Sequence, residues 1–210
     1  MTGAADRAAV LDRFDVSRET ITRLDRYAAI LIKWNPRINL VAKSTIPNIW
    51  SRHLADSLQL VRHFLPGDRR YCDFGSGGGL PGLVLASVLA ETNPDLKVVL
   101  VESDARKAAF LIAAAKEIGI SPEISNTRVE DLQPMRADVI SARALAPLPK
   151  LVGLCMPHLA IGGRCLFMKG AAYRRELDES LESWRFESEK WASETNPDAV
   201  VLQLRNIRHV

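Results

Sequence analysis

Apolar residues fall three or four positions apart over residues 17–34, which predicts an amphipathic helix. Ser17 has the side chain of an N-cap, and Asn35 followed by Pro36 should end the helix. The same spacing predicts a second helix over residues 47–65. The first sixteen residues show no strong period, so we expect them to be a frayed start.

Beyond residue 70, short apolar runs alternate with segments of helical spacing. The apolar runs are residues 71–74, 98–101, 139–141 and 165–168, and the helical segments are residues 83–89, 105–118, 148–154 and 177–184. This alternation is typical of a parallel sheet with helices on both faces. Two last runs, residues 186–191 and 199–204, have no helix between them and predict a closing hairpin.

The expected fold is therefore α/β, a doubly wound and mostly parallel sheet of the Rossmann-like kind. We expect a helical, basic N-terminal extension over residues 1–68 and one compact domain over residues 69–210. A length of 210 residues with 47% hydrophobic and 25% charged residues fits such a globular chain.

Cellular location and metal content follow from what the sequence lacks. No apolar run approaches the roughly 20 residues needed to cross a bilayer, and the N-terminus lacks the build of a secretory signal. Cys72, Cys155 and Cys165 are widely spaced and are expected to be buried thiols in a reducing cytosol. We expect a cytoplasmic protein, a monomer, with neither a membrane segment nor a metal site.

Positive charge is concentrated at the front of the chain. Residues 1–70 hold twelve Lys and Arg against seven Asp and Glu, whereas residues 71–210 hold sixteen against eighteen. A basic extension on a near-neutral body indicates an anionic partner. The alternative is a solvated helical surface that favours arginine.

The sharpest motif is DFGSGGGLPG at residues 73–82, directly after the first expected strand. In open α/β sheets, ligands lie beyond the carboxyl ends of the strands, where this loop must be. A dinucleotide fingerprint requires glycine where Leu80 stands, and no Gly-Lys-Ser/Thr follows to make a P-loop. The remaining pattern is the D-x-G-x-G-x-G loop of S-adenosylmethionine-dependent methyltransferases, formed by Asp73, Gly75, Gly77 and Gly79.

Two acidic positions support this cofactor. Glu102 ends the second strand, where a carboxylate can accept hydrogen bonds from both ribose hydroxyls. The alternative role, capping the next helix, fits Asp104 better. Residues 126–131 come after the helical segment 105–118 and before the run 139–141. They thus follow the third strand of the expected sheet, where such folds hold the adenine between a backbone N–H and an acidic side chain. Taken alone, this acidic loop is a weak signal.

At this point the chain resembles the bacterial ribosomal RNA small subunit methyltransferase G family, also called glucose-inhibited division protein B. The resemblance runs from about Tyr27 to Gly170. The matching pieces are Trp34-Asn35, Asn39-Leu40, Arg52-His53-Leu54, Asp56-Ser57-Leu58, Leu80-Pro81-Gly82, Glu102-Ser103-Asp104, Arg106-Lys107, Phe110-Leu111, residues 141–148 and Met168-Lys169-Gly170. The C-terminal ending matches only loosely.

The resemblance implies N7 methylation of a guanosine in 16S rRNA, with the small ribosomal subunit as the partner. By position, it implies cofactor contacts at Gly75, Leu80, Val129, Glu130 and Arg143. The last of these lies just past the fourth strand and faces the cleft, where it can hold the cofactor's carboxylate or the RNA. The resemblance favours the cofactor.

Two further side chains are cleft candidates. His53 lies with Asp56 and Ser57 on one expected helix, but a single helix cannot align these three groups as a hydrolase triad with an oxyanion hole. They form either a hydrogen-bonded seam with the main domain or part of the substrate cleft. Lys169 ends the fifth strand and can contact phosphate or base, or is simply solvated.

The atom methylated is also indicated by what is missing. Carbon 5 of a pyrimidine needs a cysteine nucleophile, usually in a Pro-Cys pair after the fourth strand, and no Pro-Cys occurs in this chain. Guanine N7 needs neither nucleophile nor base, so we expect no catalytic side chain beyond positioning. Two alternatives stay open: a small-molecule methyltransferase, which would not need a basic front, and a non-catalytic RNA-binding module.

Overall fold

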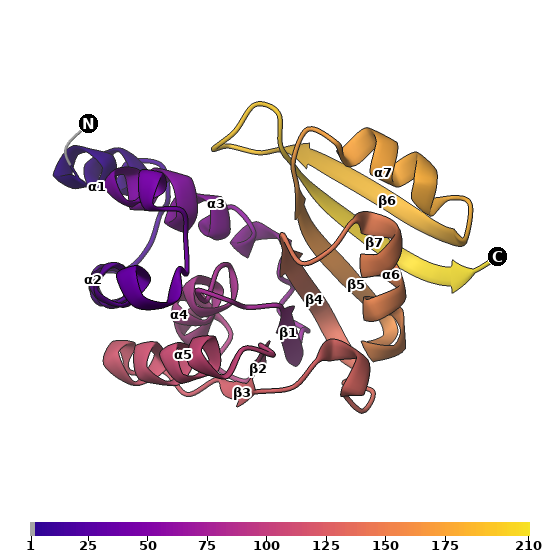
Figure 1. Cartoon of the computed structure of the whole chain (residues 1–210), viewed down its shortest axis with the longest axis horizontal. Coiled ribbons are helices and arrows are strands. Elements are labelled where there is room, and N and C mark those ends of the chain that lie inside the picture. The colour runs from indigo at the N-terminus through magenta and orange to yellow at the C-terminus, as the bar shows by residue number, and fades with distance from the viewer. Residues whose placement is uncertain (1–2) are drawn as a thin grey trace.

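The computed structural model describes residues 3–210, and its centre is a single twisted sheet (Figure 1). Over these residues the strand order is β3-β2-β1-β4-β5-β7-β6. The strands are β1 (Arg70–Phe74), β2 (Lys97–Val101), β3 (Glu123–Ser125), β4 (Ala137–Arg143), β5 (Leu159–Lys169), β6 (Trp184–Ala192) and β7 (Val200–His209). The first five are parallel, and β7 runs antiparallel to both of its neighbours. The expected mostly parallel sheet with a C-terminal hairpin is confirmed.

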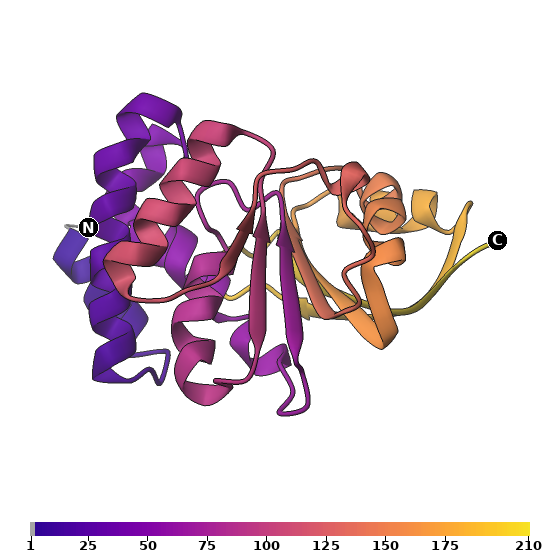
Figure 2. The same ribbon diagram turned by 90° about the horizontal axis from the view of Figure 1, so that it is seen from below.

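Helices cover both faces of the sheet (Figure 2). One face carries α4 (Gly82–Thr92) and α5 (Ala105–Ile118), and the other carries α6 (Leu148–Cys155) and α7 (Tyr173–Ser180). The apolar residues of α4 and α5 form one buried cluster with those of the N-terminal segment. The extension therefore packs as a third layer outside α4 and α5, rather than standing apart from the sheet.

The long N-terminal helix α2 spans Arg18–Ile38. Ser17 is its N-cap, as expected, because its side chain accepts from the Thr20 N–H. The predicted end at Asn35-Pro36 is wrong. Pro36 falls in the last turn and removes only the hydrogen bond that its own N–H would have made, and the Asn35 side chain exchanges two hydrogen bonds with the main chain of Val41.

The first residues are not a frayed start, since α1 covers Gly3–Leu11. The Asp6 carboxylate accepts from the N–H groups of Trp50 and Ser51, at 3.0 and 3.2 Å, and Val10 is buried. A helix held by such few tertiary contacts leaves no apolar period in the sequence. The expectation failed for that reason.

The single helix expected over residues 47–65 is also wrong in detail. This stretch contains 3-10 turns at Lys43–Asn48 and Val61–His63, a π-turn at Trp50–Leu54, and α3 at Ala55–Leu58. Pro47 lies inside the first turn and lacks an N–H, and Asp6 takes the N–H groups that follow. The helical ladder is therefore interrupted and restarts.

The helix predicted over residues 177–184 lies too late in the chain. It is α7, which ends at Ser180, and Trp184 already begins β6. The Trp184 ring packs edge-on against His209 of β7, at 5.0 Å between ring centroids. Cross-strand packing, and not helical spacing, therefore decides the position of this side chain.

The three cysteines are free and buried, as expected. Within residues 3–210, no helix has the length and apolar character that crossing a bilayer requires.

Candidate active site

The glycine loop turns from the end of β1 into α4. Gly75, Gly77 and Gly79 have φ of 69°, 53° and 81°, a region that favours glycine. Neighbouring side chains also leave no room for a larger residue at two of these positions. A Cβ at Gly75 would lie 2.8 Å from the Leu145 side chain, and one at Gly79 would lie 2.6 Å from that of Leu83. The loop therefore depends on glycine for its path.

Asp73 lies beneath this loop and closes it. Its carboxylate accepts from the Gly82 N–H at 3.2 Å and from the Ser141 hydroxyl at 2.5 Å. Burial raises the pKa of Asp73 to about 6, against which the bonds from Ser141, Ser76 and Gly82 act. With 1% of its surface exposed, Asp73 ties both ends of the loop to β4.

Glu102 stands at the end of β2 and faces the loop. Its Oε2 accepts from the Gly77 N–H and its Oε1 from the Asp104 N–H, both at 2.8 Å. Asp104 is the N-cap of α5, as expected, since its side chain accepts from the N–H groups of Arg106 and Lys107. Because each carboxylate oxygen has two acceptor positions, Glu102 can accept further donors from the loop side.

A cavity of about 210 Å³ opens next to the loop, at the carboxyl ends of β1 and β2. The structure brings three of the expected cofactor residues together in its wall: Gly75, Val129 and Glu130. Leu145 and Ala146, from the segment after β4, complete the opposite side. The cavity lies where ligands bind in open α/β sheets.

Leu80 and an unexpected neighbour hold the loop from the N-terminal side. Leu80 is buried in the apolar cluster that joins the N-terminal helices to α4 and α5. Tyr27 of α2 is fully buried and its hydroxyl donates to the Gly78 carbonyl. Sequence reasoning missed this contact, because a tyrosine on the apolar face of a helix looks like any other core residue.

Arg143 ends β4 and lies between two side chains of the segment before the sheet. Its Nη1 is 3.5 Å from Asp56 Oδ2 and 3.3 Å from His53 Nδ1. Burial, together with Arg143 and Arg52, lowers the pKa of His53 to about 4, so the imidazole is neutral at pH 7. Ser57 donates to the carbonyl of His53 and takes no part in a triad. These contacts join His53 and Asp56 to the main domain in a hydrogen-bonded seam, and the other interpretation, part of the substrate cleft, stays a prediction.

Lys169, at the end of β5, is neither solvated nor free. Its Nζ lies 2.5 Å from Glu176 Oε2 and donates to the Ala146 carbonyl at 3.3 Å. Its side chain is 11% exposed. Lys169 thereby fastens the segment after β4, which separates the first cavity from a second one.

The second cavity, of about 150 Å³, lies beyond the ends of β4 and β5. Its wall includes Arg52, Asp56, Arg143 and Lys169, together with the turn between β6 and β7 at residues 193–199. Two of the three cleft candidates, Arg143 and Lys169, thus meet at one cavity, and His53 supports Arg143.

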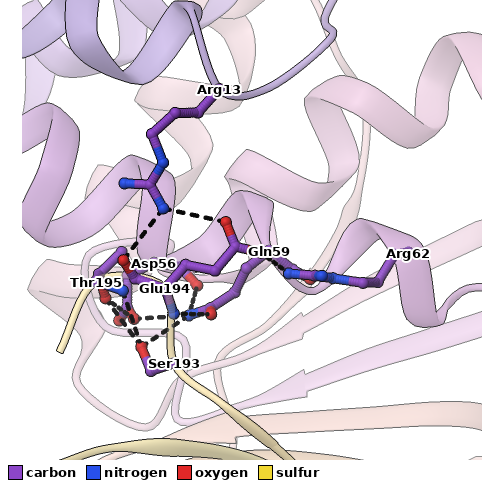
Figure 3. A network of polar contacts seen from close by, with 7 residues as sticks. All are labelled: Arg13, Asp56, Gln59, Arg62, Ser193, Glu194 and Thr195. Atoms are coloured by element: carbon purple, nitrogen blue, oxygen red, sulfur yellow. Dashed lines mark hydrogen bonds and ion pairs between the residues drawn. The ribbon is translucent and has the colours of Figure 1, made fainter. Parts of the chain in front are cut away.

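We call the contacts that hold the β6–β7 turn the polar bracket; it consists of Arg13, Asp56, Gln59, Arg62, Ser193, Glu194 and Thr195 (Figure 3). The Thr195 hydroxyl donates to Asp56 Oδ1 at 2.7 Å, and the Glu194 N–H donates to Gln59 Oε1 at 3.0 Å. The Glu194 carboxylate also pairs with Arg13 and Arg62. No motif marks the turn residues, so the sequence analysis did not find them.

Basic residues of the N-terminal segment differ in how they are held. Arg23 pairs with Glu19 at 2.6 Å and with Glu91 of α4 at 2.9 Å. Arg26 and Arg37 on α2, by contrast, are exposed, as is Arg52 at the second cavity. Among residues 3–210, no group of three or more His, Cys, Asp or Glu side chains is placed to hold a metal ion.

Comparisons with known proteins agree with this geometry. A family model described as rRNA small subunit methyltransferase G matches residues 20–199. Proteins named ribosomal RNA small subunit methyltransferase G are 47% identical in Cereibacter sphaeroides, over 96% of this chain and 98% of the relative, and 48% identical in Paramagnetospirillum magneticum, over 94% of each.

Solved structures share the fold at low identity. A ribosomal protein L11 methylase from Lactobacillus delbrueckii subsp. bulgaricus has a TM-score of 0.57 at 16% identity, covering 75% of this chain and 78% of its own. Aeropyrum pernix fibrillarin with bound S-adenosyl-L-methionine has a TM-score of 0.54 at 17% identity, covering 72% and 73%.

Proposed function

Since this chain belongs to the rRNA small subunit methyltransferase G family, we propose that it transfers a methyl group from S-adenosylmethionine to N7 of a guanosine in 16S rRNA. The observation that carries the proposal is the pairing of the glycine loop with Glu102, whose carboxylate is fixed by the Gly77 N–H beside a cavity. A basic N-terminal segment supplies the surface for an anionic partner.

The residues fit the cofactor. A Cβ at Gly77 would lie 4.0 Å from Glu102 Oε2, so glycine leaves the space beside this carboxylate open. We assign the ribose hydroxyls to Glu102, the adenine to the cavity wall at Val129 and Glu130, and the carboxylate end to Arg143. The glycine loop beside the bound cofactor is shaped by Asp73, Gly75, Gly77, Gly79 and Leu80. When bound, S-adenosylmethionine supplies an electrophilic methyl group on a sulfonium.

Methyl transfer to N7 requires little chemistry from this chain. The N7 lone pair lies in the plane of the guanine ring and points outward, so no proton has to be removed before attack. The cysteines offer no nucleophile: all three are buried, and burial raises the pKa of Cys72 to about 12. The protein's task is to align the base with the methyl group and to exclude water, so positioning supplies most of the rate.

The division of labour follows the chain. We propose that residues 1–68 meet the RNA and residues 69–210 hold the cofactor, within a cytoplasmic monomer. A sizing measurement of the purified protein tests the oligomeric state.

The decisive experiment uses small subunits, or their RNA, with labelled S-adenosylmethionine. We expect label in N7-methylguanosine at one position, and none in RNA that carries 7-deazaguanosine there. Replacing each of the three cysteines should leave turnover intact in folded protein. Cofactor binding without methylation of any RNA would favour a small-molecule substrate, and RNA binding without cofactor binding would favour a non-catalytic module.

A further inference from the structure

The second cavity lies at the same edge of the sheet as the cofactor cavity, beyond the ends of β4 and β5. Leu145 and Ala146 line the first cavity, and Arg143, at the start of the same segment, lines the second. Lys169 lines the second cavity and donates to the Ala146 carbonyl, so one short segment contributes to both cavities. A ligand in the second cavity therefore lies next to the cofactor, at the ends of β4 and β5.

The size and walls of this cavity suit a single base. Its volume of about 150 Å³ is well below the roughly 300–1,000 Å³ of pockets for larger ligands. Met168 gives it an apolar side, while Arg52 supplies positive charge for the adjoining phosphates. Enzymes that act on a base take it out of the stack into such a pocket and read its Watson–Crick edge.

The position of the methylated atom decides which edge of guanine the protein can read. N7 and O6 form the major-groove edge, and N7 must stay open toward the methyl donor. Recognition is then left to the opposite side of the ring, where guanine presents N1–H and N2–H as adjacent donors. A carboxylate accepts both, and it rejects adenine, whose N1 is an acceptor.

Asp56 is the one acidic side chain among the residues that line this cavity. Its Oδ1 accepts from Gln59 Nε2 at 2.9 Å and from the Thr195 hydroxyl at 2.7 Å. Its Oδ2 has only the longer contact to Arg143, at 3.5 Å, so this oxygen retains acceptor capacity. The polar bracket thus holds Oδ1 of the carboxylate (Figure 3), while Oδ2 has only Arg143, another residue of the cavity wall, as a neighbour.

Resting on the proposed function, we propose that the second cavity takes the target guanine and that Asp56 reads its N1–H and N2–H edge. Thr195 and Gln59 act as positioning residues for that carboxylate. The β6–β7 turn is then part of the substrate site, although it is remote from the glycine loop in the sequence.

The test combines a protein change with a base change. Small-subunit RNA is prepared with guanosine or with inosine, which lacks the 2-amino group, at the methylated position. For the wild type, we expect inosine to lower kcat/KM by about 5- to 100-fold, the range of one good base contact. Asp56→Asn should lower kcat/KM on guanosine by a similar factor and should no longer distinguish the two bases.

Two further variants separate reading from support. Thr195→Val keeps the carboxylate, so it should lower kcat/KM on guanosine less than Asp56→Asn and still prefer guanosine to inosine. Glu117→Gln, on the exposed side of α5, is the matched charge-removing control and should behave as the wild type. Cofactor affinity and the unfolding midpoint are measured for every variant, so that a loss of folding or of cofactor binding is told apart from a loss of base reading.

The outcomes are distinct. If Asp56→Asn discriminates inosine as strongly as the wild type does, Asp56 does not read the base and the inference is overturned. If wild-type protein methylates neither RNA, the proposed function itself is wrong and the inference falls with it.

Discussion

The two sides of this site are built in opposite ways. On the cofactor side, one stretch of ten residues makes the turn, and a carboxylate 25 residues further along the chain fixes it through the Gly77 N–H. On the substrate side, the polar bracket joins the segment before the sheet to the β6–β7 turn, and Asp56 and Thr195 are 139 residues apart. One side is a local motif, and the other is a tertiary assembly.

The difference shows in what each part contributes. Glycines on the cofactor side supply backbone conformation and space. The substrate side gains its shape from side-chain contacts, each of which needs a correctly placed partner. A short sequence motif can therefore form most of the cofactor side, whereas the RNA-facing surface depends on this topology.

The largest effect is expected on the cofactor side. Glu102→Ala removes the acceptor for the ribose hydroxyls and leaves the N–H groups of Gly77 and Asp104 without their partner. Bonds to a charged acceptor contribute about 1.5–3 kcal/mol each, so we expect a loss of about 2–4 kcal/mol, or roughly 30- to 1,000-fold in affinity. Titration calorimetry measures it, and RNA affinity should not change. An unaltered dissociation constant in folded protein would refute the ribose assignment.

The buried Asp73 should make stability depend on pH. Its pKa is raised to about 6 by burial, so between about pH 4 and pH 6 the folded state holds a proton that the unfolded state has lost. This contribution to stability is present below pH 4 and is lost as the pH rises through 6. With about 1.4 kcal/mol for each pKa unit, the change is on the order of 3 kcal/mol.

Asp73→Asn isolates this contribution, because asparagine does not titrate while the histidines stay in place. Urea unfolding at a series of pH values gives the difference in stability between wild type and variant. We expect the wild type to gain on the variant as the pH falls from 7 to 4. Parallel curves would mean that Asp73 keeps an ordinary pKa.

The RNA-facing side should respond to salt instead. Replacing Arg26, Arg37 and Arg52 with glutamine should weaken RNA binding and flatten its salt dependence, by about one unit of slope or less for each lost phosphate contact. Cofactor affinity should stay constant. Arg23→Gln is the comparison. Because Arg23 pairs with Glu91, this variant should lower the free energy of unfolding and should leave the salt dependence of RNA binding nearly unchanged. An equal slope in wild type and triple variant would show that these arginines are only a solvated surface.

The contrast between a local motif and a tertiary assembly also explains which features could be predicted from the sequence. Apolar runs located four of the five parallel strands, all but the short β3, and the bounds of α5 followed from Asp104 as its cap and Gly119 as its end. These signals are local, so the chain displays them directly. The glycine loop and Glu102 were found for the same reason.

Tertiary contacts left no such signal. The helix α1 is held largely by the polar side chains of Asp6 and Arg7, and Trp184 belongs to a strand because its partner is on the neighbouring strand. Arg23 counts among the basic residues of the N-terminal segment, but in the fold it pairs with Glu91 of α4. For Lys169 the sequence left a phosphate or base contact and a solvated strand end both open, and neither indicated the ion pair with Glu176. Thr195 and Glu194 carry nothing that distinguishes them from other turn residues.

The smallest effect tests whether the cofactor side is as self-contained as its motif suggests. Tyr27 of α2 donates to the Gly78 carbonyl inside the loop, and this buried bond comes from the basic N-terminal segment. Tyr27→Phe keeps the packing of the ring and leaves that carbonyl without its donor. A single hydrogen bond contributes about 0.5–1.5 kcal/mol, so cofactor affinity should fall by roughly 2- to 10-fold.

Calorimetry on Tyr27→Phe, with Tyr173→Phe on α7 as the matched control, measures this loss. The Tyr173 hydroxyl accepts from the exposed Arg174 at 3.1 Å, far from the glycine loop in the sequence, so it should be dispensable for cofactor binding. If Tyr27→Phe binds the cofactor as the wild type does, the ten-residue loop holds its own shape and the N-terminal segment serves the RNA alone. If affinity falls as expected, the segment that faces the RNA also sets the conformation of the cofactor loop. RNA binding and cofactor binding are then coupled through one hydroxyl, and RNA should tighten cofactor binding in the wild type more than in the variant.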